Sequence, residues 1–297
     1  MIVRDTPRLL DLLFSIRGSV LPKVAPRLLG LLAFSIVIVA LDADFLTLPH
    51  TSAAPLAAFG VALSLFLGFR NNAAFERWWE GRRLWGQLVS DMRSLARETD
   101  LFIKDKDLRL SILRTATAFI HLHRVQLRAL PDDQKARDWC HKDYSSQPHP
   151  PCAALNDLNA LLIEASEKGA LDGFGQKALS ERIANIGAAQ AGCERIAATP
   201  LPYVYSLLIF RTTYLYCLLT PLALIDSAGW MTPVYVCIMA YVFFGLAEVT
   251  EELAHPFGET VNGLPLDALC RTIEISMAPH IGVTPPTPLR PTNYYLS

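Results

Sequence analysis

Histidine and cysteine residues in the middle of the chain are the first candidates for chemistry, because both side chains bind transition metals. His121 and His123 are two residues apart, and Cys140 is followed directly by His141. On a helix, a spacing of two turns side chains about 200° apart, so the two histidines do not share a simple site. The Cys140-His141 pair lacks the C-x-x-C spacing of structural zinc sites. The sequence therefore predicts no metal, no cofactor and no catalytic residue, and the chain is expected not to be an enzyme.

Carboxylates form a second candidate group. Asp42 and Asp44 lie in a short connector, residues 42–52, that contains no Lys or Arg. Glu251, Glu252 and Glu259 follow the last apolar stretch of the chain. Such groups attract cations through their field and can bind divalent ions through oxygen. The solvated end of a helix gives the same pattern, so both interpretations of the three glutamates stay open.

Two arginines border or interrupt apolar segments. Arg70 follows one such segment directly, and Arg211 lies inside another. Arg70 would favour anions if it faced a pore, which opposes the effect of the carboxylates. Arg211 marks either a functional position or a structural ion pair, because a charge inside a membrane is unfavourable.

Apolar residues of one segment give the main functional hypothesis. Val61, Leu65 and Phe69, which we call the apolar row, recur every fourth residue and so fall on one face of a helix. If several copies of the chain pack around an axis, the row becomes three stacked hydrophobic rings, and such rings gate ion flow by excluding water. The spacing alone favours a simpler interpretation, a surface that packs against lipid or another helix.

Small residues follow the same period beside the apolar row. Gly60, Ser64 and Gly68 lie about 100° around the helix from it. Small residues at this spacing let helix backbones approach closely within a membrane. We therefore expect this small-residue stripe to pack on another helix.

These residues must be positioned by helices that cross a membrane. The chain has 297 residues, of which 52% are hydrophobic, and its net charge of −1 gives no sign of a nucleic-acid partner. Four apolar stretches approach or reach the length of a membrane span. They cover residues 26–41, 53–69, 203–225 and 230–247.

The distribution of basic residues predicts the topology. Lys and Arg are frequent before the first span and after the second, whereas the connectors 42–52 and 226–229 contain none. By the positive-inside rule, both termini and the long middle segment are cytoplasmic. The sequence shows no cleavable signal, and the six cysteines are expected to be free thiols.

The middle segment, residues 70–199, reads as helical. Apolar periodicity predicts that the second span continues as a helix to Leu101, and that further helices cover 108–130, 155–167 and 176–198. No strand pattern and no phosphate-binding glycine motif is present. Residues 279–297 are proline-rich without a core pattern, and predict an extended or disordered arm.

Three stretches in register resemble the bestrophins, and in particular their bacterial homologues. They are FLGFRNNAAFERWWEGRRLWG (Phe66–Gly86), AGCERIAATPLPYVYSLLIFRTTYLY (Ala191–Tyr216) and EELAHPFG (Glu251–Gly258). The resemblance covers nearly the whole chain and implies a single all-α channel domain, residues 1–297. It further implies a homopentamer with one axial pore, formed by the second span and continued by cytoplasmic helices.

The resemblance also assigns roles to residues. It places the apolar row at the hydrophobic neck of the pore, since the family has three apolar residues one helical turn apart before its F-R-N motif. It implies a second, cytoplasmic constriction, which we place at Phe174, with Leu179 as the alternative. Animal bestrophins bind calcium through a run of acidic residues after Asn-Pro-Phe-Gly. Here Gly258 is followed by a single Glu259, with Asp267 further on, so calcium binding is not expected.

The sequence thus predicts a four-span protein of the bacterial inner membrane that passively conducts small monovalent ions. The acidic residues slightly favour cations, Na⁺ or K⁺, over anions. Three alternatives remain: a chloride channel like the animal family members, a non-conducting membrane scaffold, and a membrane enzyme. The enzyme would have to use the His121, His123, Cys140 and His141 region.

Overall fold

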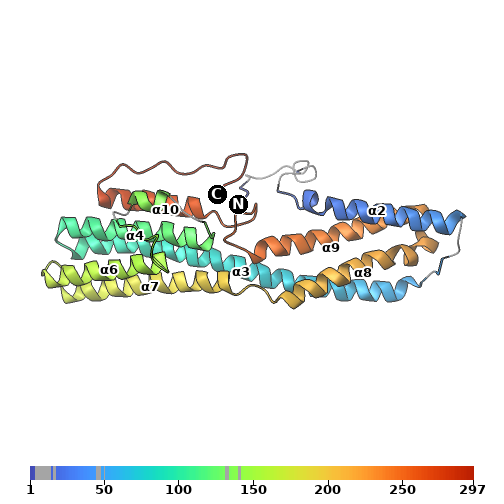
Figure 1. Cartoon of the computed structure of the whole chain (residues 1–297), viewed down its shortest axis with the longest axis horizontal. Coiled ribbons are helices and arrows are strands. Elements are labelled where there is room, and N and C mark those ends of the chain that lie inside the picture. Colours follow the sequence, from blue (N-terminus) through green and yellow to red (C-terminus); the bar gives the residue numbers. More distant parts are fainter. Residues whose placement is uncertain (4–14, 16–17, 45–47, 50, 131–133, 140–141) are drawn as a thin grey trace. The chain divides into compact units, whose positions relative to one another are not determined.

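The regular secondary structure of the described chain is helical. A computed structural model describes all residues except 4–14, 16–17, 45–47, 50, 131–133 and 140–141 (Figure 1). In this part there is no strand, and only isolated β-bridges join Ile2 to Tyr295 and Thr292 to Tyr295. The prediction of an all-α fold is confirmed.

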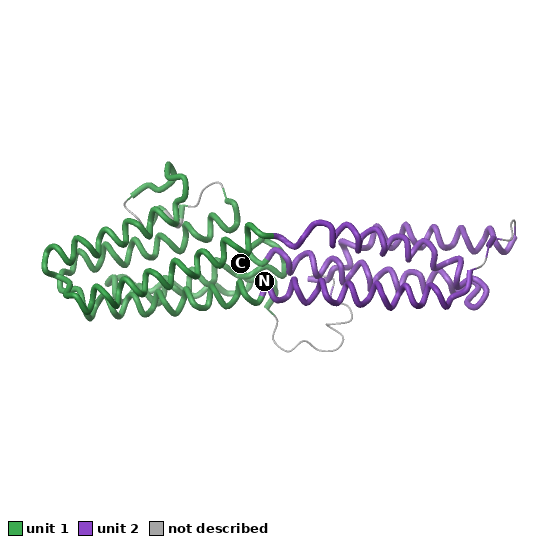
Figure 2. The backbone as a smooth tube through the Cα atoms, turned by 90° about the horizontal axis from the view of Figure 1, so that it is seen from below, with its two compact units in different colours: residues 1–4, 79–199, 256–297 green, residues 5–78, 200–255 purple. Residues whose placement is uncertain are grey.

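The helices group into two compact units, which Figure 2 shows in different colours. Unit 2 comprises residues 5–78 and 200–255, and unit 1 comprises residues 1–4, 79–199 and 256–297. The helices of unit 2 are α2 (Leu21–Asp44), the first half of α3 (Ala53–Phe102), α8 (Tyr203–Ala228), the short η1 (Gly229–Met231) and α9 (Thr232–Ala254). Unit 1 holds the rest of α3 with α4 (Lys106–Leu127), α5 (Gln134–Trp139), α6 (Pro150–Glu167), α7 (Gly173–Ala198) and α10 (Leu266–Ile281).

Unit 2 contains the helices that can cross a membrane. Three stretches of the described chain are long and apolar enough: Leu21–Asp44, Ala53–Phe102 and Tyr203–Ala254. The third includes both α8 and α9, so all four predicted spans fall within these stretches. The helices are therefore of membrane-spanning length, as the apolar stretches of the sequence predict.

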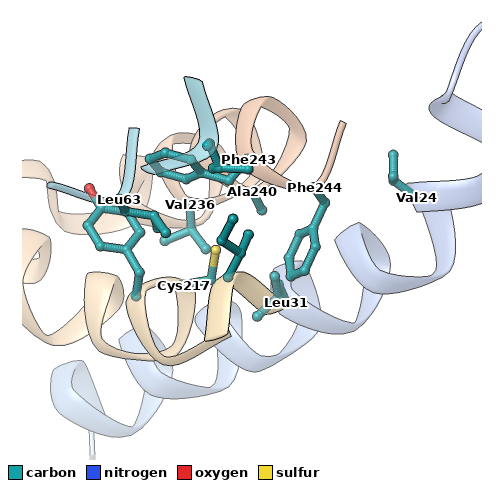
Figure 3. Close-up of a cluster of buried hydrophobic side chains, with 11 residues drawn as sticks. Val24, Leu31, Leu63, Cys217, Val236, Ala240, Phe243 and Phe244 are labelled. Atoms are coloured by element: carbon teal, nitrogen blue, oxygen red, sulfur yellow. The ribbon is translucent and has the colours of Figure 1, made fainter. Parts of the chain in front are cut away.

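The core of unit 2 is formed by side chains from four helices. Leu31 of α2, Leu63 of α3, Cys217 of α8 and Phe244 of α9 belong to one buried cluster (Figure 3). Aromatic side chains add edge contacts, since the ring of Tyr216 lies 5.2 Å from that of Phe243 and 5.8 Å from that of Phe59. T-shaped geometry at this distance is the favoured arrangement of aromatic rings.

Unit 1 is a bundle in which α4 packs against both α6 and α10, and α6 packs against α7. Its core contains the fully buried Trp85, Phe119 and Leu158. Side chains at the helix starts accept the free backbone N–H groups. Asp105 caps α4 through Leu108 N at 3.2 Å, and Asp172 caps α7 through Gly175 N at 2.7 Å.

The second span continues as α3 without a break, and α6 and α7 cover the predicted helices 155–167 and 176–198. Helix α4 ends at Leu127, three residues before the predicted end at residue 130. Helices α5 and α10 were not predicted. Because α10 includes Pro279, the prediction that the C-terminal arm starts at residue 279 is wrong; the arm follows Gly282, whose φ of +79° ends the helix.

The C-terminal arm is held on unit 1. The backbone N–H of Ala268 donates to the carbonyl of Ser297 at 2.9 Å, and the Arg271 guanidinium donates to the carbonyl of Thr287 at 3.3 Å. Residues 283–297 form no helix, and a turn at their end brings Thr292 and Tyr295 into mutual backbone hydrogen bonds of 2.9 and 3.0 Å.

Candidate functional site

The apolar row lies on the outside of unit 2. The exposed fractions of Val61, Leu65 and Phe69 are 61%, 57% and 68%. On the opposite side of α3, Leu63 and Leu67 are buried in the core, and Figure 3 shows Leu63 within that cluster. The chain therefore uses one face of α3 for its own packing and leaves the face with the apolar row uncovered.

The small-residue stripe is only partly packed within this chain. A Cβ atom added to Gly60 would lie 2.9 Å from the Tyr216 hydroxyl, so this glycine allows α8 to approach α3 closely. Gly68 has open space around its Cα, and Ser64 is exposed with its hydroxyl bonded to the Val61 carbonyl at 2.8 Å. The expected helix contact is therefore present at Gly60 and absent at Gly68 in the described structure.

Arg70 is buried and paired, although it directly follows the apolar row. Its side chain is 7% exposed, and its Nη2 donates to the Glu251 carboxylate at 2.7 Å and to the Ser206 hydroxyl at 2.8 Å. One residue turns the chain by about 100° on a helix, so Arg70 does not share the face of Phe69. Its charge is compensated by Glu251, which weakens its predicted effect on anions.

The other glutamates at the end of α9 are also paired. Lys23 at the start of α2 contacts Glu252 at 2.7 Å and Glu248 at 3.1 Å. Glu252 is 4% exposed, so it is a structural partner of Lys23 and not an open cation site. Sequence reasoning missed Lys23 and Ser206 as partners, because each lies more than a hundred residues from the group that it contacts.

Glu259 and Asp267 belong to a different network, in unit 1. Arg128 contacts Asp267 at 2.6 Å and Glu259 at 3.4 Å, and Arg124 forms an ion pair with the same aspartate. Two guanidinium groups thus occupy the carboxylate oxygens that a divalent ion would require. This arrangement gives no support to a calcium site.

The connector of residues 42–52 is described only in part. Asp44 is exposed, whereas Asp42 is partly buried and accepts the backbone N–H of Leu48 at 3.0 Å. Asp44 is therefore the more accessible of these two carboxylates.

Arg211 of α8 is exposed as well, and no ion pair is seen for it in the described residues.

The two positions considered for the cytoplasmic constriction differ in exposure. Phe174 lies in the first turn of α7 with 85% of its surface exposed, whereas Leu179 is fully buried. A buried side chain cannot line a passage, so these exposures favour Phe174.

The histidines of α4 have separate structural roles. Nε2 of His121 lies 2.8 Å from the carboxylate of Glu274, whereas the ring of His123 stacks between Trp85 and Phe119. They point to different neighbours, as their spacing predicts. Cys140 and His141 lie outside the described residues, and no group of three metal-binding side chains occurs within them.

Comparison with known proteins decides the family. A family model described as Bacterial/Fungal Bestrophin protein matches residues 1–279. The chain belongs to the bacterial and fungal bestrophin family. Among the relatives of this bestrophin is a voltage-dependent anion channel-forming protein of Mesorhizobium japonicum, 43% identical over 100% of this chain and 97% of that protein.

Further relatives extend this match. A voltage-dependent anion channel-forming protein of Escherichia coli K12 is 38% identical over 93% of both chains. A crystal structure of a bacterial bestrophin homolog from Klebsiella pneumoniae is 30% identical, with a TM-score of 0.82 over 88% of this chain and 100% of that one. None of these names is that of an enzyme, in agreement with the sequence prediction.

Proposed function

We propose that this bestrophin is an ion channel that passively conducts small monovalent ions across the bacterial inner membrane. The observation that carries the proposal is the exposed apolar row, which lies on α3 opposite the buried Leu63 and Leu67. In an isolated chain, lipid would cover these three large apolar side chains, as it would other exposed apolar residues of unit 2 such as Leu29 and Ile238. Around a symmetry axis, however, they form a hydrophobic constriction that gates by excluding water.

The assembly that completes such a pore is a homopentamer of one channel domain per chain. The family resemblance supports this number, and the exposed face of α3 supports contact with other copies. In this assembly α2, the apolar part of α3, α8 and α9 form four spans with both termini in the cytoplasm, since basic residues flank only that side. Phe174 forms the second constriction.

Selectivity follows from the charges that remain unpaired. Arg70, Glu251 and Glu252 are all in ion pairs, so their fields largely cancel. Asp44 stays exposed in an outer connector that lacks Lys and Arg, which favours monovalent cations at the mouth. The relatives from Mesorhizobium japonicum and Escherichia coli are named as anion channels, which favours anion conduction instead, and this is the second candidate.

The reversal potential of the purified protein in a planar bilayer, measured under a NaCl gradient, distinguishes the two candidates. We expect a current whose reversal follows Na⁺. A reversal that follows Cl⁻ would establish the anion candidate and overturn the argument from Asp44.

The hydrophobic gate is tested by replacing Val61, Leu65 and Phe69 together with alanine. Smaller side chains widen the constriction and admit water, so we expect higher conductance or open probability. Phe66→Ala is a matched control, because Phe66 is also exposed on α3 but lies about 100° from Leu65.

Equal currents from the triple variant and the wild type would contradict the gate assignment. A scaffold would show no current in either protein, and it would also tolerate Val61→Asp without a leak.

A further inference from the structure

A small polar cavity lies within unit 2, where the apolar parts of its helices give way to charged residues. Its volume is about 170 Å³, and α2, α3, α8 and α9 all contribute to its wall. The polar side chains of this wall are Arg27, Arg70, Ser206, Thr213, Glu248 and Glu251. We call it the Arg27/Arg70 cavity.

Two buried groups of the wall have unused hydrogen-bonding capacity. Nε of Arg70 and the hydroxyl of Thr213 have no hydrogen-bond partner in the described part of the chain. Arg70 is 8% exposed and Thr213 is 1% exposed. A buried donor without a partner destabilises a protein by roughly 1–3 kcal/mol, so the folded state should supply an acceptor here.

Arg27 provides further donors to the same cavity. Its guanidinium lies 5.9 Å from the ring centroid of Phe210 and 5.7 Å from that of Phe244, so the two aromatic rings hold it in place. Among the described residues, the carboxylate that reaches it is that of Glu248, whose oxygen is 3.8 Å away and so beyond hydrogen-bond distance. Its N–H groups are therefore available to a ligand that accepts hydrogen bonds.

The charges of the wall balance. Two arginines face two glutamates, Glu251 is 53% exposed although it pairs with Arg70, and Glu248 is 20% exposed although it also contacts Lys23, outside the wall, at 3.1 Å. A ligand that carried only negative charge would meet the two carboxylates. A ligand with both an anionic and a cationic group would complement the whole wall.

The position of the cavity identifies the class of ligand. Ser206 is near the start of α8, Arg70 follows the apolar part of α3, and Glu248 is near the end of α9. On α8, Ile209 lies between Ser206 and Thr213, and on α9, Phe244 lies about one turn further from the helix end than Glu248, so apolar side chains join the polar ones towards the middle of the helices. In a membrane-spanning unit, this change of polarity lies where lipid headgroups meet the hydrocarbon.

We propose that the Arg27/Arg70 cavity binds the headgroup of a zwitterionic phospholipid of the ethanolamine type. The phosphodiester accepts hydrogen bonds from Arg27, Nε of Arg70 and Thr213. The primary ammonium donates to Glu248 and Glu251, and the first carbons of the acyl chains contact Ile209 and Phe244.

The test measures lipid binding to delipidated, detergent-purified protein by native mass spectrometry. The probes are short-chain phosphatidylethanolamine, phosphatidylglycerol and phosphatidylcholine, with inorganic phosphate as the soluble competitor. We expect phosphatidylethanolamine to bind tightest, because phosphatidylglycerol lacks the cation and phosphatidylcholine has no ammonium N–H. Inorganic phosphate should not displace it.

Variants localise the binding. Thr213→Val and Arg27→Gln should each weaken phosphatidylethanolamine binding about tenfold, as expected for the loss of one good hydrogen bond. Thr212→Val is the matched control, since the Thr212 hydroxyl bonds to the carbonyls of Leu208 and Ile209 within α8. Thr213→Val removes a single hydroxyl and nearly keeps the shape of the side chain. If Arg27→Gln does not fold, Thr213→Val still tests the proposal.

Three outcomes would overturn the proposal. Tighter binding of phosphatidylglycerol would make this a site for anionic lipid, full displacement by inorganic phosphate would make it a site for a free anion, and equal binding by all variants would place the lipid elsewhere. The measurement needs no current, so its result is independent of the proposed channel activity.

Discussion

His123 is fully buried and has no hydrogen-bond partner among the described residues for either ring nitrogen. Its ring stacks at 5.7 Å on Trp85 and at 5.8 Å on Phe119. Burial, with a smaller contribution from the charge of His149, lowers the pKa of His123 to about 3. The imidazole is therefore neutral in the folded protein and acts as an aromatic core residue.

This neutral state makes the stability of unit 1 sensitive to acid. Below a pH of about 6.5 the unfolded chain binds a proton at His123, whereas the folded chain does not until the pH approaches 3, so stability falls as pH falls through this window. The expected contribution is about 2 kcal/mol between pH ~7.5 and pH ~5. His123→Phe keeps a stacked ring without a titrating group, and should reduce the acid sensitivity by this amount.

Thermal unfolding in detergent at the two pH values checks this prediction. His280→Gln is the control, because His280 lies on the surface beside Asp100 and not in the core. If the melting temperatures of the wild type and His123→Phe fall equally on acidification, His123 is not the group responsible.

Helix α3 has one face that packs in the core of unit 2 and another face that is exposed. Leu67 is fully buried, whereas Leu65 is more than half exposed. Leu67→Ala leaves a cavity in the core of unit 2 and should destabilise the protein by about 2–5 kcal/mol. Leu65→Ala removes a side chain that is 57% exposed and has few contacts within the chain, so it should alter conduction far more than stability.

Melting temperatures and single-channel currents of the same two variants check this separation. A large loss of stability in Leu65→Ala would show that the apolar row is a packing surface. That result would support the simpler interpretation of its spacing.

The sequence predicted the helices in which the apolar period extends over many residues. It did not predict the short helix α5 or the proline-containing helix α10. Apolar residues keep the helical spacing on both sides of Arg70, where the sequence changes from mostly apolar to charged. This spacing predicts that α3 is one continuous helix. Helix α5 has only six residues, too few for a period to be recognised. Helix α10 contains Pro279, which we interpreted as part of an irregular arm. The helix continues for two residues beyond this proline, although the missing N–H removes one backbone hydrogen bond.

For the side chains of the candidate site, local relationships could be predicted from the sequence, whereas contacts between distant residues could not. The sequence predicted that the apolar row shares a helix face, since that depends only on local spacing. It could not show that Arg70 pairs with Glu251 or that Arg128 pairs with Asp267, because these partners come from distant parts of the chain. The charges of Glu251, Glu252 and Asp267 are therefore already paired in the folded chain.

For the whole molecule, the ion pairs of Asp267 with Arg124 and Arg128 predict that calcium does not regulate the current. Arg124 and Arg128 occupy the carboxylate of Asp267, and Arg128 also reaches Glu259. Millimolar Ca²⁺ added to the cytoplasmic side should leave the open probability unchanged, as measured in a planar bilayer. A reproducible activation by Ca²⁺ would show that other residues form a calcium site.

The pair between Arg70 and Glu251 also has a consequence for biogenesis. The two residues are 181 positions apart, and a ribosome adding about 5–20 residues per second needs on the order of 10–40 s to synthesise that distance. During this time the second span is already available for insertion while its guanidinium still lacks the carboxylate. The translocon, lipid phosphates or water must hold this charge until α9 emerges, so truncation before Glu251 should produce a chain that inserts but is degraded by quality control.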